Sequence, residues 1–264
     1  MVEGRLHEKV AIITGSSRGL GQYCAIEYAR EGATVIVAAR SEQDDPSLPG
    51  TIFETARLVE ELGGKALPVV CNVADADSID AMVAKVLKTY GRIDILMNNA
   101  GVHPGGTFST IPFKRLDLSF KINVHGTFLC ARAVLPTMIE QQRGSIINIS
   151  SAAAQMGSPY GATKRAVEAF TEGLAEEQRE NGIAVNALKP VGAIDTPGMR
   201  FLGRGLSPRE KLAGLPGPEG YVEASVLLAL QTPTTCTGRT FNDVQALEHF
   251  ADPATAARFA RARN

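Results

Sequence analysis

The chain has 264 residues, with 27 Lys and Arg against 28 Asp and Glu, which gives a formal net charge of −1. Its hydrophobic share of 44% and charged share of 21% are typical of globular proteins and exclude disordered, collagen-like and disulfide-scaffold chains. The near-zero charge argues against a nucleic-acid partner or an anionic membrane surface, and the longest apolar runs are too short to span a bilayer.

Short apolar runs alternate with helical patterns from residue 10 onward. Seven runs are of strand type, at residues 10–13, 34–39, 66–71, 93–97, 145–149, 183–188 and 240–244. The stretches between them have helical character, and glycines stand where several of them end. They predict helices at about residues 20–31, 52–62, 79–90, 113–142 and 160–180.

Strands that are apolar throughout and alternate with helices are typical of a parallel sheet covered on both faces. We therefore expect an α/β fold with a single doubly wound, Rossmann-type parallel sheet, in one domain over residues 1–264. The segment at about residues 197–220 is rich in Gly and Pro and has no clear periodicity. Such a segment is either disordered or a functional lid over a substrate.

A glycine-rich turn joins the first expected strand to the first expected helix. Its candidate cofactor-binding residues are Gly15, Ser17, Arg18, Gly19, Leu20 and Gly21. Glycines there allow a tight turn and let the backbone approach a pyrophosphate, while the helix N-terminus supplies N–H groups. Loops after strands are also glycine-rich for conformational reasons alone, so the turn by itself leaves both interpretations open.

Four further motifs follow this turn in chain order. They are Asn98-Asn99-Ala100-Gly101, Asn123 within a helical stretch, Ser150-Ser151, and Tyr160-x-x-x-Lys164. With the turn, they resemble the classical short-chain dehydrogenase/reductase family over roughly residues 5–245. The insert at residues 44–52 and the run at 189–196 are similar to its hydroxysteroid-dehydrogenase-like and citronellol-dehydrogenase-like members. The resemblance implies a dinucleotide-binding and catalytic domain that transfers hydride.

The expected catalytic residues centre on Tyr160 and Lys164, which are four apart and therefore share one helix face. A nearby ammonium and the positive nicotinamide ring favour the phenolate and should lower the pKa of Tyr160, which can then exchange a proton with a substrate oxygen. The resemblance implies that Ser151 holds that oxygen. It also implies that Asn123 opens its helix locally and holds a water connected to Lys164. The alternatives are an ordinary exposed helical pair and a core-satisfied or capping Asn.

The resemblance implies further cofactor contacts after several strands. Besides Tyr160 and Lys164, these residues are Asn72, Val73, Asn99, Ala100, Gly101, Pro190, Ile194 and Thr196. Asn72 stands where the family often has Asp, and its carbonyl can still accept from an adenine amino group. The alternative is a turn-forming Asn. The stretch from Pro190 to Thr196 is one residue longer than the family's usual pattern.

The end of the second expected strand carries an arginine where NAD-preferring sites place an acidic residue. Ala39 is followed by Arg40 and Ser41, and two guanidinium groups, from Arg18 and Arg40, can clamp a 2′-phosphate. This arrangement predicts NADP(H). NAD(H) is the alternative, if both arginines are ordinary surface residues or if an acidic side chain at 44–45 reaches the ribose.

Ser151 precedes Tyr160 by nine residues, about four fewer than is usual in the family. Eight intervening residues can still bridge the distance, so we expect a more open substrate site with Ser151 beside Tyr160. In the alternative, the short loop misplaces the helix start and leaves a protein that only binds cofactor. Ser158 is the other candidate hydroxyl donor.

These patterns predict a cytoplasmic oxidoreductase acting on a mainly apolar small molecule, as a homo-oligomer (dimer or tetramer) with no nucleic-acid or membrane partner. The widely spaced cysteines favour free thiols, and the N-terminus lacks the apolar core of a signal peptide. No histidine pair has metal-binding spacing, so no metal site is expected. The alternative from another class is a catalytically weak dinucleotide-binding scaffold or sensor.

Overall fold

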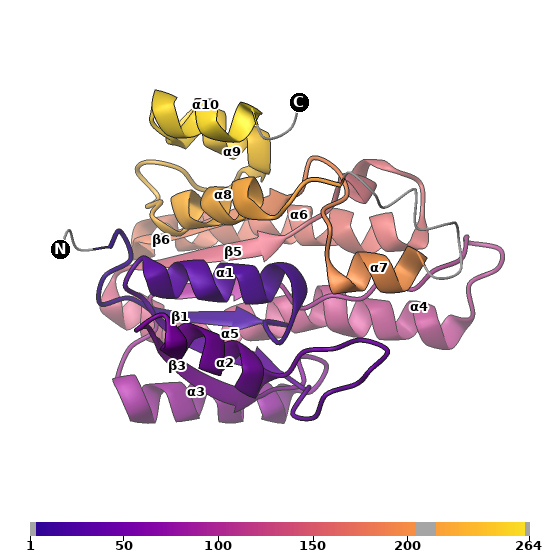
Figure 1. The fold of residues 1–264 in the computed structure, drawn as a ribbon, viewed down its shortest axis with the longest axis horizontal. Coiled ribbons are helices and arrows are strands. Elements are labelled where there is room, and N and C mark those ends of the chain that lie inside the picture. The colour runs from indigo at the N-terminus through magenta and orange to yellow at the C-terminus, as the bar shows by residue number, and fades with distance from the viewer. Residues whose placement is uncertain (1–3, 204–214, 262–264) are drawn as a thin grey trace.

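The computed structural model describes residues 4–203 and 215–261 of the chain. These residues form a seven-stranded, all-parallel sheet with the strand order β3-β2-β1-β4-β5-β6-β7 (Figure 1). The strands are β1 (Val10–Thr14), β2 (Thr34–Ala39), β3 (Lys65–Val70), β4 (Ile95–Asn98), β5 (Gly144–Ile149), β6 (Ile183–Lys189) and β7 (Thr240–Asn242). The expected doubly wound sheet is confirmed.

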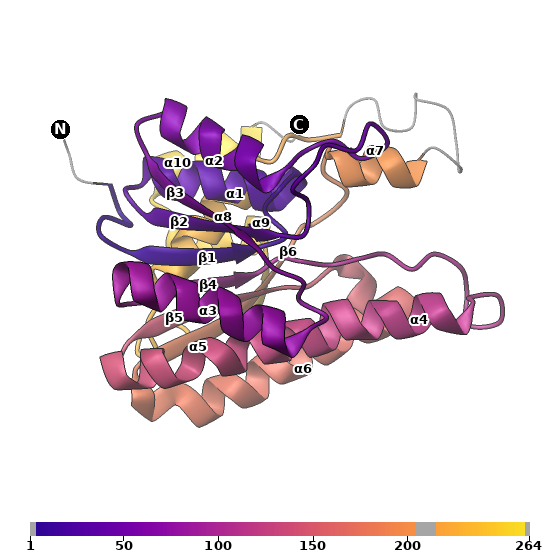
Figure 2. The same ribbon diagram turned by 90° about the horizontal axis from the view of Figure 1, so that it is seen from below.

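Helices cover both faces of this sheet. They are α1 (Gly19–Arg30), α2 (Ile52–Glu61), α3 (Ala76–Tyr90), α4 (Phe113–Phe120), α5 (Thr127–Gln141), α6 (Pro159–Gln178), α7 (Pro197–Gly203), α8 (Glu219–Ala229), α9 (Asp243–Phe250) and α10 (Pro253–Arg261). Figure 2 shows α1, α2 and α8 on one side of the strands and α3, α5 and α6 on the other. Among the described residues, no helix combines the length and apolar character needed to cross a membrane.

The strand residues alternate between two cores because successive side chains point to opposite faces of a sheet. In β1, Ala11 and Ile13 join the core under α1 and α8, whereas Val10 and Ile12 join the core under α3, α5 and α6. Both cores are dry and apolar, so all five β1 residues are buried. This double burial explains why the strands read as continuous apolar runs.

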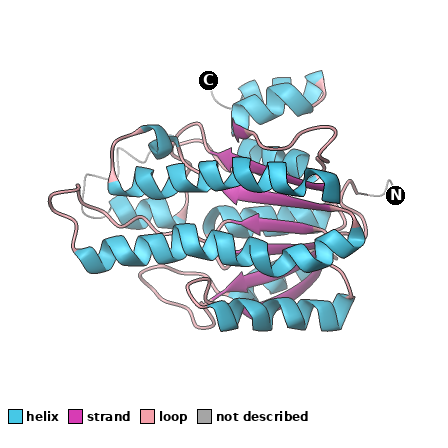
Figure 3. Cartoon of the chain, turned by 180° about the vertical axis from the view of Figure 1, so that it is seen from behind, coloured by secondary structure: helices cyan, strands magenta, loops and turns pink. Residues whose placement is uncertain are grey.

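The strand order reverses between β1 and β4, whose carboxyl ends lie side by side. All strands run in the same direction, as the arrows in Figure 3 show, so the loops that follow them gather at one edge of the sheet. In open α/β sheets, ligands bind in the crevice outside such a reversal. The glycine turn and the Asn98–Gly101 segment follow β1 and β4, and both therefore lie at this edge.

The expected strand bounds hold to within two residues, but several helices differ. The single helix expected at 113–142 is divided into α4, a π-helix at Lys121–Gly126, and α5. The strand expected at 240–244 ends at Asn242, because the Asn242 side chain accepts from the Gln245 N–H at 2.8 Å and starts α9. Within the segment expected as a lid, α7 is helical, and residues 204–214 lie outside the described residues.

Helix α8 was not expected from the sequence, because it shows no amphipathic pattern. Residues Tyr221 to Ala229 are all buried, including the polar Glu223 and Ser225. A helix buried on every side has no polar face and gives no helical period in the sequence. Helix α9 also follows the last expected strand without having been expected, whereas α10 lies where the arginines and alanines of the C-terminal tail indicate a solvated helix end.

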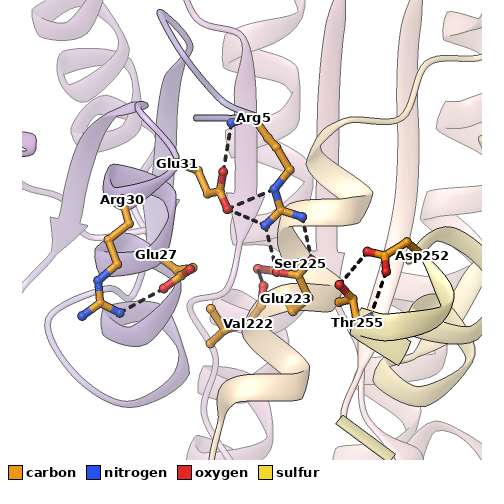
Figure 4. Close-up of polar contacts among 9 residues, drawn as sticks. All are labelled: Arg5, Glu27, Arg30, Glu31, Val222, Glu223, Ser225, Asp252 and Thr255. Atoms are coloured by element: carbon orange, nitrogen blue, oxygen red, sulfur yellow. Dashed lines mark hydrogen bonds and ion pairs between the residues drawn. The ribbon is translucent and has the colours of Figure 1, made fainter. Parts of the chain in front are cut away.

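A charged cluster ties the first described residues to α1 and α8 (Figure 4). The Arg5 guanidinium donates to the Glu31 carboxylate at 2.5 and 3.0 Å and to the Glu223 carboxylate at 2.6 and 2.9 Å. The backbone N–H of Arg5 adds a bond to Glu31 at 2.9 Å. Because both carboxylates are largely covered, one arginine neutralises two acidic groups that would otherwise repel each other.

We predict that Arg5→Ala lowers the free energy of unfolding by about 1–3 kcal/mol, because it leaves two partly buried carboxylates without their cation. The matched control is Arg30→Ala, whose exposed pair with Glu27 lies beside this cluster and should contribute less than about 0.5 kcal/mol. Urea unfolding at pH 7 measures both values. Equal losses of unfolding free energy in the two variants would contradict this stabilising role of the Arg5 cluster.

Wild type and the Arg5→Ala variant should lose different amounts of stability in acid. The hydrogen bond from Arg5 holds the pKa of Glu31 below its usual range, although burial acts in the opposite direction. A lowered carboxyl pKa stabilises the fold above the unfolded value near 4.3, and this stabilisation disappears as pH falls through the folded value. The stability difference between wild type and Arg5→Ala should therefore shrink below about pH 4.

Candidate active site

The turn after β1 requires glycine at three positions. Gly15 and Gly19 have φ angles of +67° and +59°, the left-handed region that other residues rarely adopt. A Cβ on Gly21 would lie 2.7 Å from the Gly15 carbonyl oxygen and would collide with the Asn99 side chain. Only bare backbone therefore fits here, and this is the form of cradle that a pyrophosphate needs.

Residues after β4 hold this turn in place. The Asn99 side chain donates to the carbonyl oxygens of Thr14 and Gly15 at 2.9 and 3.2 Å. The backbone N–H groups of Asn99 and Ala100 donate to the Thr14 hydroxyl at 3.1 and 3.0 Å. The glycine turn and the segment through Gly101 thus form one rigid unit at the strand-order reversal.

The N-terminus of α1 is available to an anion. Its N-cap residue, Arg18, is extended and makes no side-chain bond to the first N–H groups of the helix. Ser17 is buried, and Leu20 packs partly against the core beneath α1. The turn residues expected from the sequence therefore surround a helix end whose backbone donors and dipole favour a negative group.

Arg18 and Arg40 are close enough to influence each other at the end of β2. The Arg18 guanidinium donates to the Pro49 and Gly50 carbonyl oxygens at 2.9 and 2.6 Å and to the Ser41 hydroxyl at 3.1 Å. Burial is the largest cause that lowers the pKa of Arg18; the charges of Asp45 and Asp44 oppose it, and the charge of Arg40 adds a smaller lowering. Arg40 itself is exposed.

The acidic residues of the neighbouring loop are bonded within that loop. Asp44 accepts from the Gly50 N–H at 2.9 Å, and Asp45 accepts from the N–H and hydroxyl of Ser47 at 2.8 and 2.7 Å. These bonds use one oxygen, Oδ1, of each carboxylate, so they do not by themselves exclude a ribose contact through the other oxygen. The positive pair, Arg18 and Arg40, stands at the strand end itself.

Tyr160 and Lys164 lie in the first two turns of α6. The Lys164 ammonium is 3% exposed, donates to the Ile149 carbonyl oxygen at 2.6 Å and lies 5.8 Å from the centre of the Tyr160 ring. Burial lowers the pKa of Lys164 to about 8. The pair is not an ordinary exposed one, since the lysine is enclosed at the end of β5.

The pKa of Tyr160 is raised in the chain by itself. Burial raises it, and a contribution from Ser151 acts in the opposite direction. The expected lowering rested on the ammonium and the positive nicotinamide ring together, and only the first of these belongs to the chain. His103 lies against the Tyr160 ring, with the two ring centres 4.6 Å apart.

The short segment between Ser151 and Tyr160 forms one turn of 3₁₀ helix, Ala152–Gln155, and then reaches α6 directly. Ser151 caps this turn by accepting from the Ala153 N–H at 3.2 Å. Ser158 is the N-cap of α6, accepting from the Gly161 N–H at 2.9 Å, and Pro159 occupies the first helical position, where proline is favoured. The helix start is therefore well formed, and Ser151 lies close enough to the Tyr160 phenol to act on its pKa.

Asn123 lies in the π-helix and is fully buried. Its side-chain oxygen accepts from the Val102 N–H at 2.8 Å, and its amide group donates to the Val102 carbonyl at 2.9 Å and the Thr163 hydroxyl at 3.0 Å. The Asn123 side chain is thus satisfied within the core, and the helix widens locally at this residue. The side chain joins the segment after β4 to α6 beside Lys164.

The remaining expected cofactor residues lie at the same edge of the sheet. Asn72 forms a turn by accepting from the Ala74 N–H at 3.2 Å, and Val73 is buried. After β6, Pro190 is half-buried and Ile194 is buried. Thr196 is also buried and accepts from the Met199 N–H at 3.2 Å, which places it at the start of α7.

Glu168, Gln155 and Lys189 form a polar cluster near the site that the sequence did not predict. Glu168 is buried on α6, and its carboxylate meets the side chains of Gln155 and Lys189. A signal was present, because Glu168 follows Lys164 by four residues and therefore lies on the same helix face. The sequence does not show that partners from β6 and from the short segment converge on it.

Known proteins resemble this chain over most of its length. Residues 9–205 match the family model described as short chain dehydrogenase. "Hydroxysteroid dehydrogenase-like protein 2" from Homo sapiens is 39% identical over 206 residues, which cover 76% of this chain and 49% of that protein. Its Xenopus tropicalis namesake is 34% identical over 253 residues, 93% of this chain and 59% of that protein. The chain thus spans about half the length of these curated relatives.

Solved structures are similar as well. The crystal structure of a short chain dehydrogenase from Mycobacterium thermoresistibile is 34% identical to this chain and superposes with a TM-score of 0.83. The superposition covers 94% of this chain and 89% of that one. The similarity therefore extends through nearly all the elements of the sheet and its helices.

We predict that Gly161→Ala lowers the free energy of unfolding by about 1–3 kcal/mol. A Cβ there would collide with the carbonyl oxygens of Ala153 and Met156, because the short segment packs directly on the start of α6. The control is Gly173→Ala in the same helix, where nothing lies within 4 Å and alanine is the better helix former. Urea unfolding should show loss for the first variant and none for the second. Similar values would contradict the tight packing.

Proposed function

This chain belongs to the short-chain dehydrogenase family of oxidoreductases, and we propose that it transfers hydride between NADP(H) and a carbonyl or alcohol carbon of a mainly apolar small molecule. The observation that supports this proposal best is the grouping of Ser151, Tyr160 and Lys164 beside the glycine cradle. A scaffold that only binds a dinucleotide has no need of a buried lysine next to a tyrosine phenol.

The glycine turn and its neighbours would hold the cofactor. Gly15, Gly19 and Gly21 offer bare backbone at the N-terminus of α1, and Ala100 and Gly101 border the same crevice. We assign Asn72, Val73, Pro190, Ile194 and Thr196 to the rest of that crevice on the family pattern. When bound, the nicotinamide supplies the hydride acceptor or donor, and the protein supplies binding and orientation.

The chain's own residues handle the proton and the substrate oxygen. In the chain by itself, Tyr160 keeps its proton at neutral pH, so it can donate that proton to a carbonyl oxygen as negative charge develops there. Ser151, which lies close enough to the same phenol to act on its pKa, is placed to donate a second hydrogen bond to that oxygen. Lys164 is held by the Ile149 carbonyl, and Asn123 fixes the backbone of Val102 beside it.

The end of β2 supports NADP(H) over NAD(H). Arg18 and Arg40 lie close enough for their charges to act on each other; the carboxylates of Asp45 and Asp44, which are bonded inside their own loop, also act on Arg18. A 2′-phosphate would relieve the repulsion between the guanidinium groups. NAD(H) remains the alternative cofactor.

We also propose a cytoplasmic homo-oligomer, a dimer or tetramer, assembled through α5 and α6. Exposed and half-buried apolar side chains line a depression there, among them Val124, Phe128 and Phe170. Phe128 is 47% exposed and packs on Phe170, with ring centres 5.5 Å apart. Contiguous apolar surface of this kind marks an association site. The buried free thiols of Cys24, Cys71 and Cys130 are compatible with a reducing compartment.

The cofactor assignment predicts that Arg40→Ala lowers kcat/KM for NADPH about 10- to 100-fold, through loss of a charge-assisted contact with the 2′-phosphate. The value for NADH should change little, since NADH has no such group. Steady-state kinetics with both cofactors measure this, with Arg57→Ala as a control for removing a surface charge on nearby α2. A higher kcat/KM for NADH than for NADPH in the wild type would contradict the assignment.

The catalytic assignment predicts that Ser151→Ala lowers kcat about 100- to 1000-fold and leaves the Kd for NADPH nearly unchanged, because the hydroxyl acts on developing charge. The control is Ser158→Ala, which removes only a helix cap. A turnover screen over small ketones, terpenoid aldehydes, steroids and acyl thioester ketones supplies the substrate. An unchanged kcat in Ser151→Ala, or tight NADPH binding with no turnover across the panel, would contradict the proposal.

A further inference from the structure

A buried carboxylate that the proposed chemistry does not use lies behind the candidate active site. Glu168 is on α6, one turn after Lys164, and only 2% of it is exposed. The Ser150 hydroxyl donates to one carboxylate oxygen at 2.8 Å, and the Lys189 ammonium donates to the same oxygen at 3.3 Å. The other oxygen accepts from Gln155 at 3.4 Å and from Arg165 at 3.1 Å.

These partners come from three separate parts of the fold. Ser150 directly follows β5 and directly precedes Ser151. Gln155 is the last residue of the 3₁₀ turn in the short segment before α6, and Lys189 is the last residue of β6, directly before Pro190. The Lys189 ammonium also donates to the Gln155 side-chain oxygen at 3.1 Å. One carboxylate therefore joins the strand end that carries Ser151 to the segment that must reach Tyr160.

The charge of this carboxylate is balanced locally. Burial alone would raise the pKa of Glu168, but the hydrogen bond from Ser150 and the positive charge of Lys189 outweigh it and lower the pKa. Lys189 is largely covered, whereas Arg165 is mostly exposed and is the weaker partner. A charged, buried carboxylate with several donors holds its partners more rigidly than neutral hydrogen bonds would.

We propose that Glu168 is a positioning residue, which fixes Ser151 against Tyr160 by anchoring Ser150 on one side and Gln155 on the other. This inference rests on the function proposed above. The segment between Ser151 and Tyr160 is a single 3₁₀ turn that leads directly into α6, so an anchor at Gln155 acts only four residues from Ser151.

The first test needs no substrate. In Glu168→Gln, which keeps the shape of the side chain but removes its charge, the amide groups of Ala153, Ala154 and Met156 should exchange hydrogen for deuterium at least several-fold faster. All three donate to residues within the segment. Glu172→Gln, which removes an exposed carboxylate from the same helix, is the matched control and should exchange like wild type.

The second test measures turnover of the panel compound with the highest kcat/KM. Glu168→Gln should lower kcat about 10- to 100-fold, as expected for a misplaced catalytic group, with the Kd for NADPH within twofold of wild type. In a Ser151→Ala background the same substitution should have no further effect, because Glu168 acts through Ser151. Gln155→Leu leaves the buried carboxylate in place. Like Glu168→Gln, it should raise the exchange rates and lower kcat.

The outcomes separate this inference from the proposed function. Unchanged exchange at residues 153–156 in Glu168→Gln and Gln155→Leu would overturn the anchor, whatever the activity. A loss of kcat that persists undiminished in the Ser151→Ala background, or an equal loss of NADPH affinity, would show a general structural role and also overturn it. Absence of turnover in the wild type would refute the proposed function, while the exchange experiment still decides on the anchor. If Glu168→Gln fails to fold, Gln155→Leu provides both measurements.

Discussion

The bonds between Thr14 and the Asn99–Ala100 segment are the contact on which the site depends. They join the carboxyl ends of β1 and β4, the two neighbouring strands at which the strand order reverses. Parallel strands leave a crevice at such a point, because the following connections depart in opposite directions. With Asn99 across the turn, Gly21 has no room for a side chain, and the N-terminus of α1 faces the crevice.

Buried polar side chains extend this rigidity from the cofactor crevice toward α6. The Asn98 amide donates to Asn148 at 2.9 Å, and Asn148 donates to the Thr171 hydroxyl at 2.9 Å. Asn123 and Lys164 are bonded to backbone groups after β4 and at the end of β5. Leaving a buried polar group without a hydrogen-bond partner costs free energy. These bonds therefore favour the one packing of the strands and helices in which every such group is paired. The network thereby sets the positions of the candidate catalytic groups, which lie far apart in the chain.

The short segment between Ser151 and Tyr160 shows how a loop can be reduced without moving the groups at its ends. A single 3₁₀ turn, a serine N-cap and a proline at the first helical position are enough to start α6 in register. Gly161 is the residue that allows this close approach. The exposed His103 ring lies against Tyr160.

The sequence by itself determined the parallel sheet, the glycine turn and the candidate catalytic residues. Strands buried on both faces and motifs of fixed spacing are local properties of the chain, as the runs at β1 and β2 and the Tyr160-x-x-x-Lys164 spacing illustrate. Only the tertiary structure decided what depends on enclosure and on distant partners. Helix α8 is buried on all sides and so leaves no period, the pKa of Tyr160 rises because the fold encloses the phenol, and Glu168 acquires its role from side chains that the fold brings to it from β5, β6 and the short segment. Burial and long-range contact are properties of packing, which neither composition nor spacing encodes.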